Sequence, residues 1–158
     1  MSAAPDLVRE RVEALPDPEL PMITLGELGV IRSARTADDG CVEVEFTPTF
    51  LGCPAIPAIT EAIADVLADC GHPDGRVRQV LSPAWTPERI TAAGRDKLAQ
   101  HGIAPPGGPT PVGLGLGTPC PHCGSQDTRP HSSFGPTRCQ SLLRCARCRE
   151  IFPCITAM

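Results

Sequence analysis

Four cysteines in the last quarter of this 158-residue chain have the spacing of metal ligands. They form two pairs, Cys120-Pro121-His122-Cys123 and Cys145-Ala146-Arg147-Cys148. Two residues between cysteines let both sulfurs of a tight turn reach one ion, and two such turns supply a tetrahedral set. The gap of 21 residues between the pairs is slightly longer than is common, and a longer hairpin accommodates it. The pattern predicts a zinc-ribbon-like unit with four cysteine ligands over residues 118–158.

The sequence leaves the metal and the full ligand set open. Zinc is the expected ion, and an iron–sulfur cluster held by the same thiolates is the alternative. Cys139 is an alternative ligand that could replace one of the four, and Cys154 also lies near them. A small buried hydrophobe is the ordinary role for such cysteines. His122 and His131 are ligands by type, and we expect both at the surface.

Cysteine usage over the whole chain also favours metal binding over disulfides. The sequence holds nine cysteines, an odd number that cannot pair completely. Its first residues have neither a basic start nor an apolar stretch, so we expect no secretory signal. No run approaches the roughly 18–20 apolar residues that a membrane span needs. A cytoplasmic location is therefore expected, and structural disulfides are rare there.

Cys53 is a second candidate for chemistry, in the first part of the chain. It follows a predicted strand and stands at, or just ahead of, the start of a predicted long helix. Free amides and the helix dipole at such a position favour a thiolate, which raises reactivity and affinity for iron. The alternative is a buried cysteine that fills the strand–helix junction. Cys41 and Cys70 are expected to be structural.

The elements that position Cys53 form an expected α/β domain with helices packed on a three-stranded sheet. Alternating Val42, Val44 and Phe46 predict a half-buried strand. Apolar residues at three- and four-residue intervals predict a helix over 56–70. The remaining expected elements are an opening helix with Leu7, Val8, Val12 and Leu15 on one side, a strand at 28–31 in a hairpin with 42–46, a strand at 76–81, and a helix from Thr86-Pro87 to Gly102 with Ile90, Ala93 and Leu98 facing inward.

A Pro/Gly-rich stretch predicts a division of the chain. Residues 104–117 have no helical or strand period and are typical of a linker. The predicted limits are an α/β domain at 1–103, the linker at 104–117 and the metal-binding unit at 118–158. Residues 1–117 carry 9 Lys/Arg against 16 Asp/Glu, whereas residues 118–158 carry 5 Arg against 2 acids.

Catalytic machinery of a familiar kind is missing from the sequence. There is no Gly-rich phosphate loop, no nucleophile elbow and no carboxylate/histidine set with di-iron spacing. The basic tail favours nucleic acid only weakly, because the first part is acidic and the chain has only four Phe, one Trp and no Tyr. We expect a protein that is not an enzyme by itself and binds neither nucleic acid nor membrane.

Motifs in the first part resemble the small α/β domain of iron–sulfur assembly factors of the SufT type. They are Asp17-Pro18-Glu19-Leu20-Pro21, Gly29-Val30-Ile31 and Thr47-x-Thr49-x-x-x-Cys53-Pro54. More specific blocks, in both parts of the chain, are similar to the PaaD family, the D subunits of phenylacetyl-CoA epoxidases. They are Ser82-Pro83-Ala84-Trp85-Thr86, Gly94-Arg95-x-Lys97-Leu98, Gly102-Ile103-Ala104-Pro105-Pro106, Cys120-Pro121-x-Cys123-Gly124-Ser125, Ser133-Phe134-Gly135-Pro136-Thr137-x-Cys139 and Cys145-x-x-Cys148-x-Glu150-x-Phe152. The chain departs from the family near its C-terminus, where Ile151 replaces a proline.

This resemblance implies an accessory part in aerobic phenylacetate breakdown. The family's epoxidase converts the aromatic ring of phenylacetyl-CoA to an epoxide with a di-iron subunit, a scaffold subunit and a flavin/iron–sulfur reductase. The PaaD subunit is understood to help its metal centres mature. On the matching positions, Cys53 would hold iron or a cluster transiently, with Asp17, Glu19 and Thr47 as the other motif residues. The implied partners are the other epoxidase subunits and the iron–sulfur assembly machinery.

A different function remains open beside maturation. The chain could be a purely structural subunit that docks on the oxygenase through its ribbon. That function needs only the four tail cysteines, whereas maturation also needs Cys53.

Overall fold

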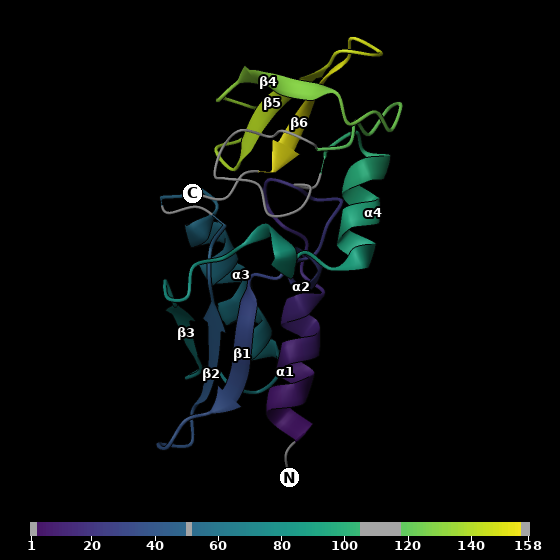
Figure 1. Cartoon of the computed structure of the whole chain (residues 1–158). Helices are drawn as coiled ribbons and strands as arrows, with labels where there is room; N and C mark the ends of the chain where they lie inside the picture. The colour runs from purple at the N-terminus through teal and green to yellow at the C-terminus, as the bar shows by residue number, and fades with distance from the viewer. Residues whose placement is uncertain (1–2, 50–51, 105–117, 156–158) are drawn as a thin grey trace. The chain divides into compact units, whose positions relative to one another are not determined.

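The computed structural model describes residues 3–49, 52–104 and 118–155 (Figure 1). Their contacts group into two compact units, residues 1–85 and residues 86–158, here called unit 1 and unit 2. Each unit is built around its own three-stranded sheet. Among the described residues no helix is long and apolar enough to cross a membrane.

Unit 1 has the expected α/β order of helices and strands. In chain order its elements are α1 (Ala3–Glu13), α2 (Leu25–Leu28), β1 (Ile31–Thr36), β2 (Val42–Phe46), α3 (Ile56–Asp69) and β3 (Arg76–Gln79). The strand order is β1-β2-β3, with β1 antiparallel and β3 parallel to β2. The predicted hairpin and the predicted strand after the long helix are present. The first strand of the hairpin begins at Ile31 and not at residue 28, because residues 25–28 form the short helix α2, which the sequence analysis did not predict, and Gly29 caps it.

The core of unit 1 follows from the alternation in β2. Val42, Val44 and Phe46 are at most 3% exposed, and the inward face of α3 supplies Ile59, Ile63 and Leu67. The intervening Glu43 is held by Arg35 at 2.6 Å and Arg78 at 3.4 Å, so charged side chains cross the three strands. Period two in the strand and period 3.6 in the helix thus bring their apolar sides together. Leu7, expected in this core, is 47% exposed.

One end of the sheet of unit 1 collects the loops that carry the sequence motifs. β1 begins there, while β2 and the parallel β3 end there. The Thr47 amide donates to Val30 O, and the Val80 amide donates to Phe46 O, each at 2.8 Å. The buried indole of Trp85 donates to Leu28 O at 2.9 Å. Hydrogen bonds therefore join the segments before β1, after β2 and after β3 at this end of the sheet.

Unit 2 is a β-ribbon preceded by a helix. Its elements are the 3-10 turn η1 (Pro87–Arg89), α4 (Ala92–Gln100), β4 (Thr128–Ser132), β5 (Gln140–Cys145) and β6 (Ile151–Ile155). The three strands pair antiparallel in the order β4-β5-β6. Ala104, just after α4, adds a parallel bridge to β6: its amide donates to Pro153 O and its carbonyl accepts from the Ile155 amide.

The start of α4 differs from the sequence prediction. Thr86 and Pro87 open only the turn η1, and Ile90 is extended. Thr91 is the N-cap, because its hydroxyl accepts a hydrogen bond from the Gly94 amide at 3.1 Å. The helix therefore begins five residues later than a Thr86 cap implies, and Ala93, expected to face inward, is exposed.

The two units divide the chain ahead of the predicted linker. The contacts place α4 with the ribbon, although the sequence assigned residues 92–100 to the first domain. The bridge from Ala104 to Cys154 is the physical reason, because it ties the end of that helical segment to the ribbon sheet. Residues 105–117 of the predicted linker lie outside the described residues, and the limits 1–103, 104–117 and 118–158 stay a prediction.

Candidate metal centre and cysteine site

The four tail cysteines lie on two turns with the same hydrogen-bond pattern. In the first turn, the Gly124 amide donates to Cys120 O at 2.8 Å, and the Cys120 amide donates to Ser125 O at 2.9 Å. In the second, the Arg149 amide donates to Cys145 O at 3.0 Å, and the Cys145 amide donates to Glu150 O at 2.9 Å. Each Cys-x-x-Cys turn is thus closed by its own backbone before any ligand is considered.

The fifth residue of each turn has a left-handed backbone. Gly124 has φ +74° and Arg149 has φ +67°. Glycine adopts this conformation without cost, whereas an L side chain there loses about 1–2 kcal/mol. The second turn therefore carries a strained residue at the position where the first turn carries glycine.

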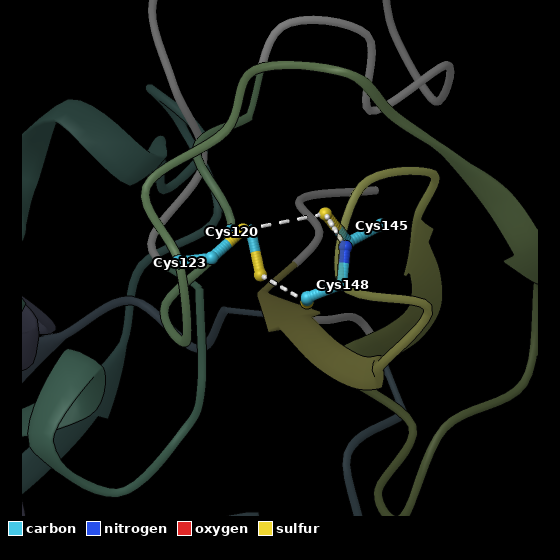
Figure 2. Close-up of side chains that lie close together, drawn as sticks. All are labelled: Cys120, Cys123, Cys145 and Cys148. Carbon is cyan, nitrogen blue, oxygen red and sulfur yellow. Dashed lines mark hydrogen bonds between the residues drawn. The ribbon is translucent and has the colours of Figure 1, made fainter.

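The two turns bring the four sulfurs together (Figure 2). All four Sγ atoms lie within 4.8 Å of one another. The Cys120 and Cys148 sulfurs are 3.7 Å apart, and the Cys123 and Cys145 sulfurs are 3.6 Å apart. Cys123 and Cys145 therefore pair across the turns, as do Cys120 and Cys148, and the pairs predicted from their spacing form one cluster.

The sulfur spacing fits one tetrahedral ion. A Zn–S bond of about 2.3 Å places the sulfurs of a tetrahedral site about 3.8 Å apart. The observed separations of 3.6 and 3.7 Å are close to that value. Cys120, Cys123, Cys145 and Cys148 would hold such an ion, which would supply positive charge to four thiolates and no chemistry of its own at a filled coordination shell.

The surroundings of these thiols favour one thiolate and disfavour a second beside it. A hydrogen bond from the Cys148 amide is the main cause that lowers the pKa of Cys145 to about 6. The Glu150 amide lowers the pKa of Cys148, but desolvation and the three neighbouring sulfurs outweigh it and raise that pKa to about 12. One thiolate therefore forms readily, and further thiolates beside it need a positive charge between them.

Cys139 and Cys154 do not belong to the four-sulfur group. Among the described residues the metal-ligand group contains only the four cysteines of the two turns. Cys139 is buried, with its sulfur 3.1 Å from the Thr137 hydroxyl, and Cys154 is buried with its thiol donating to Ile155 O. Burial raises the pKa of Cys154 to about 11. His122 and His131 are exposed, as expected.

The ribbon has a small apolar core of its own. A buried cluster there consists of Ala104, Cys120, Leu143, Cys145, Phe152 and Cys154. Three of these six are cysteines, and two of the cysteines are ligands in the proposed metal site. Large apolar side chains are few, so the ligand set itself occupies the centre of the ribbon.

Cys53 lies in unit 1 between β2 and α3, as predicted. It is 9% exposed, and its carbonyl accepts a hydrogen bond from the Ile56 amide at 3.2 Å. The helix begins at Ile56 with Ala55 as its N-cap, so Cys53 stands two residues ahead of the cap. Cys53 is thus both buried at the strand–helix junction and close to the start of the helix, so its position is compatible with both interpretations of this cysteine.

Thr47 and Arg32 form the other contact at this end of the sheet. The Thr47 hydroxyl accepts from Arg32 Nε at 2.7 Å, and Thr47 is 2% exposed. The same guanidinium donates to Pro83 O. Arg32 therefore joins the segment after β2 to the segment after β3, a role that the sequence did not predict because its partners lie 15 and 51 residues away.

Asp17 holds the loop between α1 and α2. Its carboxylate oxygen Oδ1 accepts from the amides of Glu19 and Leu20, each at 2.9 Å. Burial raises the pKa of Asp17, and the two amide hydrogen bonds act against that rise. Asp17 is thus a structural carboxyl as well as a motif residue, while Glu19 is half-buried beside it.

The predicted residues of unit 1 share one end of the sheet. Thr47 and Cys53 follow β2, and the loop of Asp17 and Glu19 precedes β1, which begins where β2 ends. Arg32 and Trp85 are additional residues at this end. Their signal in the sequence was weak: Trp85 is the single tryptophan, and Arg32 follows an apolar stretch.

Comparison with known families matches both units. The family described as the PaaD zinc beta ribbon domain matches residues 105–155, and the iron-sulfur cluster assembly protein family matches residues 6–81. The chain is 39% identical over 139 residues to an Escherichia coli protein that is named as the D subunit of a "Putative 1,2-phenylacetyl-CoA epoxidase". That match covers 87% of this chain and 84% of the Escherichia coli protein.

Shorter relatives and one solved structure match the first part of the chain. The Fe-S protein maturation auxiliary factors YitW of Bacillus subtilis and SufT of Staphylococcus aureus are 31% and 36% identical, covering 57% and 48% of this chain and 80% and 85% of theirs. A domain of unknown function from Bacillus anthracis has the same fold, with a TM-score of 0.54 and 24% identity over 61% of this chain and 92% of its own.

Metal removal should unfold the ribbon and spare unit 1. We expect a chelator to collapse the dispersed NMR signals of residues 118–154, because the apolar core is small and metal binding supplies the folding free energy of such a unit. Trp85 reports on unit 1, so its emission spectrum should not change, nor should the urea midpoint of unfolding that is followed by its fluorescence. Dispersed ribbon signals after complete chelation would contradict this dependence on metal.

The two turns should respond in opposite directions to exchange of their left-handed residue. Gly124→Ala should weaken metal retention, and Arg149→Gly should strengthen it, each by about fivefold from a strain of about 1 kcal/mol. A Cβ at Gly124 meets no atom within 4 Å, so only the backbone is strained. Competition with a chelator measures both variants, and equal effects in the same direction would refute the strain at Arg149.

The stability of unit 1 should be less affected by Asp17→Asn than by Asp17→Ala. Asp17→Asn keeps an oxygen that accepts from both amides and removes the cost of a buried charge. Asp17→Ala leaves the amides unpaired and should cost about 1–3 kcal/mol. Because the folded pKa is raised, the wild type should lose stability relative to Asp17→Asn as the pH rises through that pKa. Urea melts followed by Trp85 fluorescence test this, and a destabilised Asp17→Asn variant would contradict it.

Proposed function

The chain belongs to the PaaD family, and from this we propose that it is a non-catalytic accessory protein that assists maturation of the iron or iron–sulfur centres of a phenylacetyl-CoA epoxidase. The observation that carries the proposal is the pairing, in one chain, of an iron–sulfur assembly unit with a ribbon of four clustered cysteines. A relative over most of the chain length bears the name of an epoxidase subunit, and the relatives of unit 1 bear names of maturation factors.

Iron handling belongs to unit 1 in this proposal. Cys53 supplies a soft thiolate ligand at a helix start, where amides and the helix dipole favour negative charge. Its small exposed fraction suits a transient site, since an iron held there is shielded from bulk water and still reachable from the surface. Thr47, Asp17 and Glu19 shape the loops at the same end of the sheet.

The ribbon holds a structural zinc ion in this proposal. Four sulfurs within 4.8 Å of one another, two pairs of them at tetrahedral separations, would fill the coordination shell of one ion and leave no open position for a substrate. A mononuclear ion draws all four sulfurs toward one point, whereas a cluster distributes them over several irons. The close spacing therefore favours zinc over an iron–sulfur cluster. With no metal chemistry of its own, the ribbon has a docking role in this proposal.

A purely structural docking subunit is the second candidate function. It is supported by the ribbon, which has its own sheet and its own ligand set in a unit separate from Cys53. Docking alone does not require any residue of unit 1 to bind iron. The two functions therefore differ in whether they require the sulfur of Cys53.

Replacement of the Cys53 sulfur distinguishes maturation from docking. We expect an epoxidase produced with the Cys53→Ser variant to assemble but to lack most of its iron and activity. Cys70→Ser is the matched control, because Cys70 is a partly buried cysteine at the other end of α3. Iron content and epoxidase activity of the purified complex are the measurements.

The outcome decides between maturation and docking. Normal iron and full activity with Cys53→Ser would refute maturation through this thiol and leave docking. Zinc content of the accessory chain should be about one ion per chain in both variants, since neither residue belongs to the ribbon. A variant with reduced zinc would point to a folding defect rather than to lost iron transfer.

A further inference from the structure

The turn between β4 and β5 displays an unusually exposed aromatic side chain. Phe134 is 84% exposed, whereas Phe46 and Phe152 are each 1% exposed. The other large apolar side chains that the described residues expose reach at most 52%. A Phe at the tip of this hairpin contributes nothing to the buried cluster of the ribbon, and its ring is available for contact with a partner.

The backbone around Phe134 is held by contacts within the turn. The Phe134 amide donates to the Ser132 hydroxyl at 3.1 Å, and the Gln140 amide donates to Thr137 O at 3.2 Å. Gly135 packs so closely that a Cβ there would lie 2.8 Å from Gln140 O. Only glycine fits this place, which fixes the path of the chain directly after Phe134.

The C-terminal side of the turn is anchored in the ribbon. Cys139 and Gln140 are 5% and 3% exposed, and the Cys139 sulfur contacts the Thr137 hydroxyl at 3.1 Å. The exposed Phe134 therefore stands on a turn whose two sides are fixed. An aromatic side chain presented in this way loses little conformational entropy when a partner covers it.

The charge next to this tip is positive. Residues 131–140 contain no acidic residue, and the exposed Arg138 is their one Lys or Arg side chain. Arg129 lies at the other end of β4, opposite Arg144 of β5, where it pairs with Asp127 at 3.7 Å between Nε and Oδ1. Arg138 is therefore the guanidinium that the tip offers to a partner's carboxylates.

We propose that residues 133–138 form a docking tip that inserts Phe134 into an apolar pocket rimmed by acidic side chains on a subunit of the epoxidase. This inference rests on the proposed function, because it takes its partner from there, and it adds the contact through which the ribbon binds. Aromatic anchors in pockets are typical hot spots of interfaces, and rim charges steer their association.

Binding of the intact, metal-loaded chain to the purified epoxidase subunits tests the docking tip. Phe134→Ala should raise the dissociation constant at least about 30-fold, the loss typical of a hot spot. Phe134→Trp should retain most of the binding, because it keeps an aromatic anchor. Ile151→Ala is the matched control, since Ile151 is a 45% exposed apolar residue on β6 of the same ribbon.

A charge variant tests the acidic rim separately. Arg138→Glu should weaken binding through the association rate, and the difference from wild type should shrink as salt screens the charges. Zinc content and circular dichroism of each variant should match wild type, because Phe134 and Arg138 are both exposed. These checks separate a lost contact from a lost fold.

Each alternative result has a distinct meaning. Wild-type binding by Phe134→Ala, or an equal loss with Ile151→Ala, would overturn the docking tip and leave the proposed function standing. If Phe134→Ala instead changes only self-association in size-exclusion chromatography, the occupant is a second copy of this chain and the inference fails. If the wild-type chain does not bind the epoxidase, the proposed function fails together with its docking tip.

Discussion

The convergence of four cysteine sulfurs, which can all ionise only around a cation, is the constraint on which the ribbon depends. The sulfurs lie within 4.8 Å of one another, and two of the four ligand cysteines belong to the buried cluster. The turn with Cys145 and Cys148 joins β5 to β6, and the other turn leads into β4. A cation at this place therefore offsets the charge and fixes the connections of all three strands at once.

Unit 1 is stabilised by a different kind of constraint, the satisfaction of polar groups at one end of its sheet. Arg32 donates hydrogen bonds to Thr47 and Pro83, and the indole of Trp85 donates to Leu28. The Asp17 carboxylate accepts from two amides of its own loop. The motif residues thus maintain the fold as well as any chemistry. A substitution that changes shape and chemistry together would confuse the two roles, which is why isosteric replacements are informative here.

Local patterns were predictable from the sequence, and distant contacts were not. The paired cysteines and the alternation in β2 are self-contained signals, because the spacing alone fixes which side chains converge. The start of α4 was missed because Thr86-Pro87 and Thr91 are competing start signals, and only the extended Ile90 decides between them. The strain at Arg149 has no signal, since arginine is rare in left-handed turns.

The same distinction applies to the site in unit 1. The position of Cys53 before a helix follows from a strand pattern and a helix pattern on either side of it. The contact between Arg32 and Thr47 depends on how a strand start and a strand end meet across the sheet. Such register is set by tertiary pairing, which a single sequence does not reveal.

The bridge between Ala104 and Cys154 extends the ribbon beyond its three strands. Ala104 is fixed to β6, and Thr118 is buried with its carbonyl accepting from the Thr128 hydroxyl, so the residues on either side of 105–117 are both attached to unit 2. A recombinant ribbon fragment therefore needs Ala104 as well as residues 118–155 to keep its fourth paired segment.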